Sequence, residues 1–399
     1  MRGSTFSTEH LASNGGNLMK KMLLLVLTLV IALPSLPARA KESNHFLTPG
    51  EMVKAMDKSK TSYKIDMLKS LKDMGPEQFA EVYWPSSEKQ LEYPWISDDG
   101  KGGLSLLSYP FEGGSMDIVK EAESAYGDKK YDRAAELYQK AIEASPKCYF
   151  AYIGLGDCRF FSGDFDKALE SYQKATDLNP FDFRGFFFKA HALVKMKRFK
   201  EAKEAFIESL TLHPRRKSII TTVKNYATQM GVVIEDASFL PQSLARLEGD
   251  TVAIYSNPED LPWFYHAMCK GFWLGEPGHR KELTGHEEHR WSTSEESECL
   301  AALVIGYEQS REDGKIPQNA TIERIKTILD DGMLNEFVYY QIYARLSPDV
   351  TLLLPAAERS KLKDYVAKYV LVPSNESDAG KGDAKTGPSS RPSGWSGSG

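Results

Sequence analysis

The chain has 399 residues, of which 41% are hydrophobic and 26% are charged. This length and composition are typical of a globular protein with two or three packed units. The formal net charge of −5 provides no general attraction for nucleic acid or for an anionic membrane surface, so the overall charge argues against both classes of partner.

Residues near the N-terminus have the pattern of a cleavable secretory signal peptide. Two lysines precede an apolar run over residues 22–33, Pro34 ends that run, and small residues follow up to Ala40. The run is shorter than the ~20 residues of a transmembrane helix, so an uncleaved anchor is the weaker alternative. We expect removal of residues 1–40, a mature chain from Lys41 that is free of the membrane, and a location in the bacterial periplasm or outside the cell.

Residues 41–114 are expected to contain one helix and an ordered connector. Apolar side chains recur along one stripe from Pro49 to Met74, which predicts a helix. The segment that follows is rich in Gly, Pro and Ser, yet it carries aromatic residues at Tyr93–Trp95 and within Leu104–Phe111. Because disordered linkers seldom contain so many aromatic side chains, we expect this connector to pack on another part of the chain.

The central segment repeats itself. Three stretches of similar sequence end at Pro146, Pro180 and Pro214, and 180 − 146 and 214 − 180 both give 34 residues. A fixed period in this range indicates stacked supersecondary units. We place the three units at residues 115–148, 149–182 and 183–216.

Large and small side chains recur in phase within these units. Large residues fill the space between two helices, small residues let the helices approach closely, and the proline ends the second helix. Each unit is therefore predicted to be a helical hairpin that buries its apolar face only by stacking on its neighbours. The large positions are Ile118, Tyr152 and Phe186; Tyr131, Phe165 and Phe199; and Tyr138, Tyr172 and Phe206. The small positions are Ala122, Gly156 and Ala190; Ala134, Ala168 and Ala202; and Ala141, Ala175 and Ser209.

This pattern resembles the tetratricopeptide repeat family. The central repeat matches the family's positions most fully, whereas Lys129 and Lys197 replace the usual turn glycine in the outer two. The resemblance implies an α-solenoid of three hairpins, and residues 217–231 continue the phase as a capping helix. The matching residues of the central repeat are Tyr152, Leu155, Gly156, Gly163, Phe165, Ala168, Tyr172, Ala175 and Pro180.

The resemblance also implies that a protein or peptide binds the concave surface lined by the first helix of each repeat. By the family's spacing, that groove is lined by Val119, Glu123, Ile153, Asp157, Phe160, Phe161, Arg184, Phe187, Phe188 and His191. Two alternatives remain open: these aromatic residues belong to ordinary packing between repeats, or the connector at residues 93–111 covers them.

One subclass of the family clamps the acidic C-terminal tails of heat-shock chaperones with basic and amide side chains. The corresponding positions here hold Val119, Glu123, Gly154, Arg184 and Phe188. A single basic residue remains of that set, so we expect no carboxylate clamp.

Residues 232–373 are predicted to form a helical C-terminal domain with a possible strand at Thr251–Tyr255, and residues 374–399 a flexible Gly/Ser/Pro-rich tail. Cys148 and Cys158 are predicted to lie about 15 Å apart on one helix, too far for a disulfide. Whether Cys269 and Cys299 pair stays open at this point.

A cluster of histidine and glutamate at residues 276–289 suggests a different function. His279, His286 and His289 are candidate metal ligands among four glutamates, since such side chains bind zinc. The H-E-x-x-H spacing of zinc proteases is missing, so a metal-binding protein or metal-dependent hydrolase is the alternative hypothesis and not the main one.

Other catalytic patterns are missing from the sequence, including G-x-S-x-G and the phosphate-binding G-x-x-x-x-G-K. We therefore predict an all-α exported adaptor that binds a protein or peptide, with neither an enzymatic activity nor a cofactor. The sequence does not predict its oligomeric state.

Overall fold

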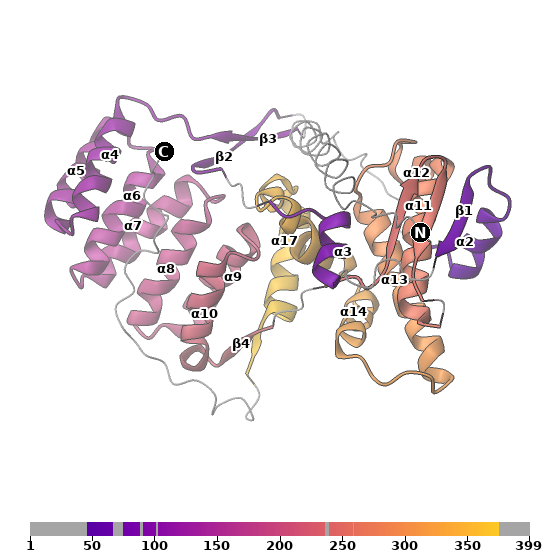
Figure 1. The fold of residues 1–399 in the computed structure, drawn as a ribbon. Coiled ribbons are helices and arrows are strands. Elements are labelled where there is room, and N and C mark those ends of the chain that lie inside the picture. Colours follow the sequence, from indigo (N-terminus) through magenta and orange to yellow (C-terminus); the bar gives the residue numbers. More distant parts are fainter. Residues whose placement is uncertain are drawn as a thin grey trace, which may run out of the picture. The chain divides into compact units, whose positions relative to one another are not determined.

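The computed structural model describes residues 46–66, 75–87, 91–100, 103–235, 239–257 and 259–374 (Figure 1). These residues divide into two units: residues 96–106 form one, and residues 46–95 with 107–374 form the other. The predicted signal peptide lies outside the described residues, as does the predicted tail beyond Ser374.

Six helices form the three hairpins predicted from the repeats. Their first helices begin at residues 115, 149 and 183, and both intervals are 34 residues. Figure 1 shows these helices side by side in chain order, followed by α10 (Lys217–Met230), the predicted capping helix. The hairpins consist of α4 (Ser115–Gly127) with α5 (Tyr131–Ala144), α6 (Tyr149–Phe161) with α7 (Phe165–Leu178), and α8 (Phe183–Lys195) with α9 (Phe199–Leu212).

Small residues in the hairpins lie directly against large aromatic rings. A Cβ atom added to Gly154 would lie 2.2 Å from the ring of Tyr138, and one added to Gly156 would lie 2.5 Å from the ring of Tyr172. Both tyrosines are fully buried. The alternation of large and small positions in the sequence is thus a condition for close helix packing.

The turn inside each hairpin has a left-handed residue at the same repeat position. Its φ is 60° at Lys129, 83° at Gly163 and 59° at Lys197. The two lysines therefore keep the turn geometry that glycine adopts freely, at a cost of about 1 kcal/mol each.

The N-terminal part departs from the helix predicted over Pro49–Met74. Helix α2 (Pro49–Met56) begins with a capping box between Thr48 and Glu51 and ends at Met56, and strand β1 (Ser62–Asp66) follows. Residues 67–74 lie outside the described residues. The prediction was wrong after Met56 because β1 pairs with a strand far along the chain, which helical periodicity cannot reveal.

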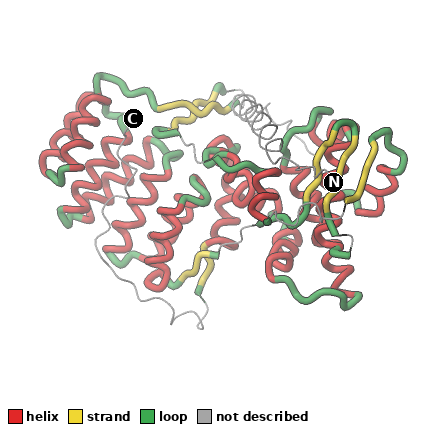
Figure 2. The backbone as a smooth tube through the Cα atoms, in the orientation of Figure 1, coloured by secondary structure: helices red, strands yellow, loops and turns green. Residues whose placement is uncertain are grey.

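Strand β1 is one of the two edge strands of a three-stranded sheet in the order β1-β6-β5. It pairs in parallel with β6 (Thr251–Tyr255), the predicted strand, and β6 pairs antiparallel with β5 (Leu244–Glu248). Ile254 and Val252 of β6 face Gly271 of α11 (Leu261–Gly275). The C-terminal region therefore contains a small sheet besides its helices, although the described chain is mainly helical, as predicted (Figure 2).

The other elements of the described chain are short or belong to the C-terminal helices. Strands β2 (Pro94–Asp98) and β3 (Leu104–Ser108) form a two-stranded sheet, and β4 (Val232–Ile234) pairs antiparallel with β7 (Leu371–Pro373). The helices are α3 (Pro76–Tyr83), α12 (Pro277–Thr284), α13 (Thr293–Glu312), α14 (Ala320–Asp330), α15 (Leu334–Phe337), η2 (Val338–Tyr343), α16 (Ala344–Leu346), η3 (Val350–Leu353), α17 (Ala356–Tyr365) and η4 (Val366–Val370). Among the described residues, none of these helices combines the length and apolar character that a membrane span requires.

Helix α9 connects the repeats to the C-terminal region. The hydroxyl of Thr351 in η3 donates a hydrogen bond to the carbonyl of Leu212 at 3.0 Å, and Lys363 of α17 forms an ion pair with Glu208. The last repeat therefore packs on helices from the end of the chain.

Candidate functional site

Most of the predicted groove residues are inside the protein. Glu123, Phe160 and Phe161 are half-buried, and the other seven are buried. At these seven positions the protein's own packing covers the predicted groove, so the side chains are not accessible to a partner. Partner binding by the other three residues stays a prediction. The buried seven are Val119, Ile153, Asp157, Arg184, Phe187, Phe188 and His191.

Polar groove residues are bound by the second helix of their own repeat. The hydroxyl of Tyr138 donates a hydrogen bond to Glu123, and that of Tyr172 donates one to Asp157 at 2.7 Å. In the third repeat the equivalent pair is His191 and Phe206, whose ring centroids are 6.1 Å apart.

His191 differs from its counterparts because Phe206 offers it no hydroxyl. The Nε2 atom of His191 has no hydrogen-bond partner among the described residues. Burial, with a smaller effect of Lys195, lowers the pKa of His191 to about 4. The imidazole is therefore neutral at pH 7 and serves as an apolar packing group beside Phe187, whose ring centroid is 4.6 Å away.

A strip of aromatic side chains crosses the repeats near the ends of their first helices. We call Tyr131, Phe160, Phe161 and Phe165 the aromatic strip; each of them is half-buried. Tyr131 stacks on Phe161 at 5.2 Å, Phe161 contacts Phe160 at 5.6 Å, and Phe160 contacts Phe165 at 5.3 Å. The strip therefore presents partly accessible rings from two successive repeats.

Arg184, the basic residue of the predicted groove, is bound by its own chain. Its guanidinium forms an ion pair with Asp182 and donates a hydrogen bond to the carbonyl of Glu92 at 2.7 Å. Burial alone would lower the pKa of Arg184, but the carboxylate of Asp182 raises it. A permanently charged, internally paired arginine cannot serve as an open clamp for an acidic tail.

Two parts of the connector cover the first turns of α6 and α8. We call residues 91–95 and 107–111 the strap. The ring of Tyr93 lies 5.0 Å from that of Phe150, and the ring of Tyr109 lies 5.1 Å from that of Tyr149. Of the predicted groove residues, the strap contacts Arg184; the half-buried Phe160 and Phe161 instead contact other rings of the repeats.

The comparisons with known proteins agree with the geometry of the repeats. Family models described as tetratricopeptide repeat match residues 119–183 and 183–215. The chain contains tetratricopeptide repeats. Among curated proteins, none matches this sequence.

Solved structures that resemble the chain include other tetratricopeptide proteins. The first such domain of Spaghetti (RPAP3), bound to the HSP90 peptide SRMEEVD, is 19% identical, with a TM-score of 0.27 over 28% of this chain and 87% of that one. The Yersinia enterocolitica type III secretion chaperone SycD, in complex with a peptide of the translocator YopD, is 20% identical, with a TM-score of 0.27 over 29% and 88%. The Arabidopsis OM64 domain is 21% identical, with a TM-score of 0.28 over 29% and 95%.

Outside the tetratricopeptide repeats, the predicted histidine cluster separates into different contacts. His279 Nε2 lies 2.8 Å from Glu298 Oε2, and His289 Nε2 lies 2.9 Å from Glu295 Oε2. Among the residues that the structure describes, no three His, Cys, Asp or Glu side chains are placed to hold a metal ion. The predicted grouping of His279, His286 and His289 as metal ligands is therefore not formed.

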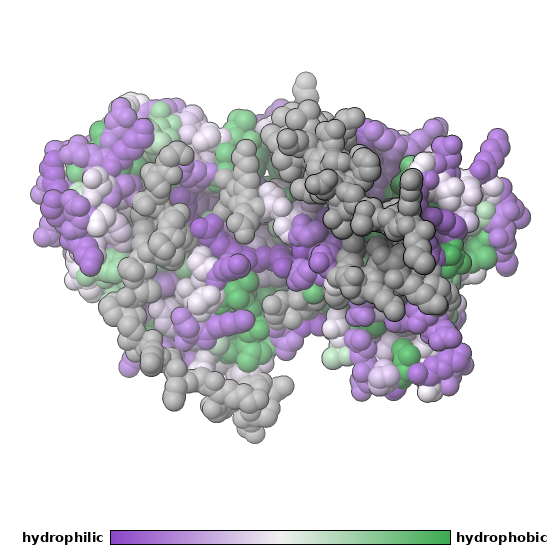
Figure 3. Space-filling view, viewed as in Figure 1, coloured by the Kyte–Doolittle hydropathy of each residue, from purple (hydrophilic) through white to green (hydrophobic). Residues whose placement is uncertain are grey.

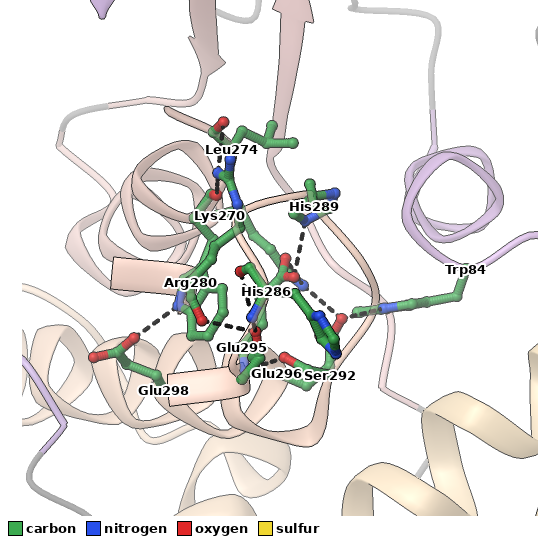
Figure 4. A network of polar contacts seen from close by, with 12 residues as sticks. Trp84, Lys270, Leu274, Arg280, His286, His289, Ser292, Glu295, Glu296 and Glu298 are labelled. Carbon is green, nitrogen blue, oxygen red and sulfur yellow. Dashed lines mark hydrogen bonds and ion pairs between the residues drawn. The ribbon is translucent and has the colours of Figure 1, made fainter. Parts of the chain in front are cut away.

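His279 and His289 instead contact glutamates of a buried charged cluster at the start of α13, and Figure 4 shows His289 beside Glu295. Lys270 of α11 lies 3.0 Å from Glu295 and 2.6 Å from Glu296, and Trp84 of α3 donates a hydrogen bond to Glu296 at 2.8 Å. Burial raises the pKa of Glu296, whereas Lys270 and His289 overcome the effect of burial at Glu295 and lower its pKa to about 2. The cluster joins three separate segments of the chain through charge-assisted hydrogen bonds.

A third glutamate extends this cluster toward the N-terminal part of the chain. Glu298 accepts hydrogen bonds from the indole of Trp273 at 2.7 Å and from the backbone of Leu47 at 2.8 Å. The glutamates of α13 do not stand out in the sequence, because acidic residues in the first turn of a helix are usually solvated and are favoured there by the helix dipole. The signal that separates them from solvated residues is burial, which only the fold reveals.

Proposed function

We propose that this protein is an adaptor whose tetratricopeptide repeats bind a segment of a partner protein. The observation that carries the proposal is the aromatic strip, whose half-buried rings pass from one repeat to the next. Partly exposed aromatic side chains held in place by their neighbours are typical anchors of protein interfaces, because they bury a large apolar area at a small cost in side-chain entropy.

The hydrogen bonds and the ion pair of the polar groove residues favour partner binding over catalysis as the function of the repeats. Glu123 and Asp157 are hydrogen-bonded to tyrosines, and Arg184 is paired with Asp182. Among the predicted groove residues, the half-buried side chains without such a polar partner are Phe160 and Phe161, which are apolar. We infer that the partner contributes apolar or aromatic side chains to the strip, and that an acidic C-terminal tail is a poor ligand.

The visible face of the molecule is compatible with a localised contact. In the space-filling view, hydrophilic residues cover most of the surface over α4 and α5, and hydrophobic areas are smaller and separated (Figure 3). A partner that binds through a few rings fits such a surface, because energetically dominant contacts occupy a small part of an interface.

Export is a separate part of the proposal and rests on the pattern of residues 1–40. N-terminal sequencing of the protein isolated from its native cells tests it directly. Export with signal cleavage gives a mature chain that begins at Lys41, whereas a chain that retains the apolar run over residues 22–33 contradicts it.

The binding proposal is tested by photo-crosslinking in native cell extract. A photoreactive phenylalanine analogue at position 161 is expected to capture one defined partner, and the variant Phe160→Ser/Phe161→Ser is expected to lose that partner in a pull-down. Substitutions at Phe187 are unsuitable because this side chain is buried in the repeats.

The matched control for this pull-down is Leu247→Ser. Leu247 is an exposed apolar residue on β5, outside the repeats. Its replacement should leave the captured partner unchanged. Equal loss with both variants, or equal capture by the Phe160→Ser/Phe161→Ser variant and the unmodified protein, would show that the aromatic strip is not the binding surface.

A further inference from the structure

The strap contains the same short motif twice. Its two halves carry Tyr93-Pro94-Trp95 and Tyr109-Pro110-Phe111, so each presents tyrosine, proline and a second aromatic residue. The halves contact each other: the Tyr109 amide donates a hydrogen bond to the Tyr93 carbonyl at 2.8 Å, and Tyr93 and Phe111 lie 5.1 Å apart. The two halves are therefore paired, and residues 94–95 and 107–108 belong to strands β2 and β3.

The repeats hold this structure mainly through its backbone carbonyls and tyrosine rings. The side chain of Asn179 donates a hydrogen bond to the carbonyl of Pro94 at 2.8 Å, and Arg184 donates one to the carbonyl of Glu92. The guanidinium of Arg184 also lies 5.3 Å from the centre of the Tyr93 ring and 4.7 Å from that of Phe150. Tyr93 is thus held between an aromatic ring and a cation.

The second half of the strap is held in a similar way. The hydroxyl of Tyr109 donates a hydrogen bond to the carbonyl of Lys147 at 2.8 Å, and its ring contacts Tyr149 edge-on. The ordinary tyrosine pKa of 10.0 already keeps this hydroxyl protonated at pH 7, and burial raises the pKa of Tyr109 to about 12. Both halves use a tyrosine as the anchor, followed by a proline that restricts the backbone before it to extended conformations.

These contacts recognise a chemical pattern that another chain could also present. We infer that the first turns of α6 and α8 form a binding site for extended Tyr-Pro-aromatic segments, that the chain fills this site with its own strap, and that a partner segment of the same kind displaces the strap. This inference rests on the proposed partner binding by the repeats, and it names the partner's chemistry. The strap competes at the high effective concentration of an attached segment, about millimolar, so a free peptide binds well only when the strap is weakened.

Cys148 provides a natural reporter of strap release. Its thiol is buried, and its neighbours on both sides, Lys147 and Tyr149, contact Tyr109 of the strap. We therefore expect removal of the strap to make Cys148 more accessible to reagents. Cys158, buried farther along the same helix, reports unfolding of the repeat itself.

The first experiment measures maleimide labelling of both cysteines by mass spectrometry in the full chain. The variant Tyr93→Ser/Tyr109→Ser should label at Cys148 at least about tenfold faster than the unmodified protein, with Cys158 unchanged, because local opening exposes only the first turn. A synthetic peptide with the sequence of residues 107–113, LSYPFEG, should restore protection of Cys148, because it carries the Tyr109 half that contacts both neighbours of this cysteine. A peptide of the same composition, with the tyrosine and proline separated, should have no effect.

The second measurement uses hydrogen exchange of the unmodified protein and does not depend on how the variant folds. The amides of residues 91–95 and 107–111 should exchange about 100-fold faster than those of α6, since opening of the strap requires less free energy than unfolding of the repeat. Excess LSYPFEG peptide should accelerate strap exchange further. Strap amides that exchange only together with α6, or equal behaviour of the two peptides, would overturn the inference.

These outcomes are separate from those of the proposed function. The peptide is copied from this chain, so the labelling and exchange experiments need no cellular partner. If the crosslinking and pull-down experiments at Phe160 and Phe161 fail, the proposed function is contradicted. The site that binds the protein's own strap is not affected by that outcome. Failure of both peptide experiments would remove the strap site and leave the aromatic strip untouched.

Discussion

At the scale of single residues, buried histidines make folding sensitive to acid. His266 is fully buried among the rings of Tyr83, Phe239 and Trp263, at centroid distances of 6.1, 5.7 and 5.6 Å. Neither ring nitrogen has a hydrogen-bond partner among the described residues. Burial, together with the charge of Lys270, lowers the pKa of His266 to about 3.

We expect His266→Phe to remove part of this acid sensitivity. The folded protein keeps His266 neutral, whereas the unfolded chain protonates it below its ordinary pKa of 6.5. The contribution of His266 to the free energy of unfolding is therefore fully present above pH 6.5. It decreases by about 3 kcal/mol as the pH falls from 6.5 to 4. Urea unfolding of both proteins at these two pH values measures the effect. The stability difference between variant and unmodified protein should shift in the variant's favour at pH 4; a difference that stays constant would contradict the assignment.

At the scale of single elements, the turns of the hairpins show how the repeats tolerate departures from their pattern. Lys129 and Lys197 adopt the left-handed conformation that Gly163 has in the central repeat. Space does not force glycine at this position, since a Cβ added to Gly163 would meet no atom within 4 Å. A side chain there costs free energy because it disfavours the left-handed backbone conformation, and the stabilisation from helix packing is larger than this cost.

Replacing lysine by glycine and replacing glycine by alanine at these turns should therefore change the stability of the protein in opposite directions. Lys197→Gly is expected to stabilise the protein by about 0.5–1 kcal/mol, because glycine adopts positive φ without strain. Gly163→Ala is expected to destabilise it by about 1 kcal/mol for the same reason. Thermal unfolding followed by circular dichroism checks both. Equal signs for the two variants would show that side-chain contacts, and not backbone strain, dominate at these turns.

At the scale of the larger unit, α9 belongs both to the repeats and to the packing of the C-terminal helices. Thr351 and Lys363 contact the end of the third repeat, and β4, which follows the capping helix, pairs with β7 at the end of the described chain. The Ser374 amide also donates a hydrogen bond to the carbonyl of Gly231 at 3.0 Å. Residues near the start and the end of the C-terminal region thus pack next to the third repeat and its capping helix.

This arrangement predicts joint unfolding of the repeats and the C-terminal region. Thr351→Val should lower the stability of both by about 1–2 kcal/mol, because the buried carbonyl of Leu212 loses its donor. Differential scanning calorimetry should show one transition for the two regions, and the variant should shift it as a whole. Two transitions, of which the variant moves only one, would show that the regions unfold independently.

Local pattern explains which parts of the fold the sequence predicts. The repeats are predictable because each hairpin buries side chains within about 34 residues, so that Tyr138, Tyr172 and Phe206 recur in phase. The end of α2 at Met56 cannot be predicted from local pattern, since the strand that follows it, β1, pairs with a distant strand. The candidate site residues divide in the same way: the positions of Phe160 and Phe161 follow from the repeat, whereas the burial of Arg184 under Glu92 and Tyr93 depends on a connector without periodicity.

The parallel pairing of β1 with β6 has a consequence for biosynthesis. Ser62 pairs with Thr251, which lies 189 residues later in the chain (251 − 62). A ribosome produces the chain from its N-terminus at about 5–20 residues per second, so β1 waits roughly ten seconds or more for the strand that completes it. During that interval the residues of all three hairpins are already synthesised, whereas Tyr63 and Ile65 still lack the strand with which they pair.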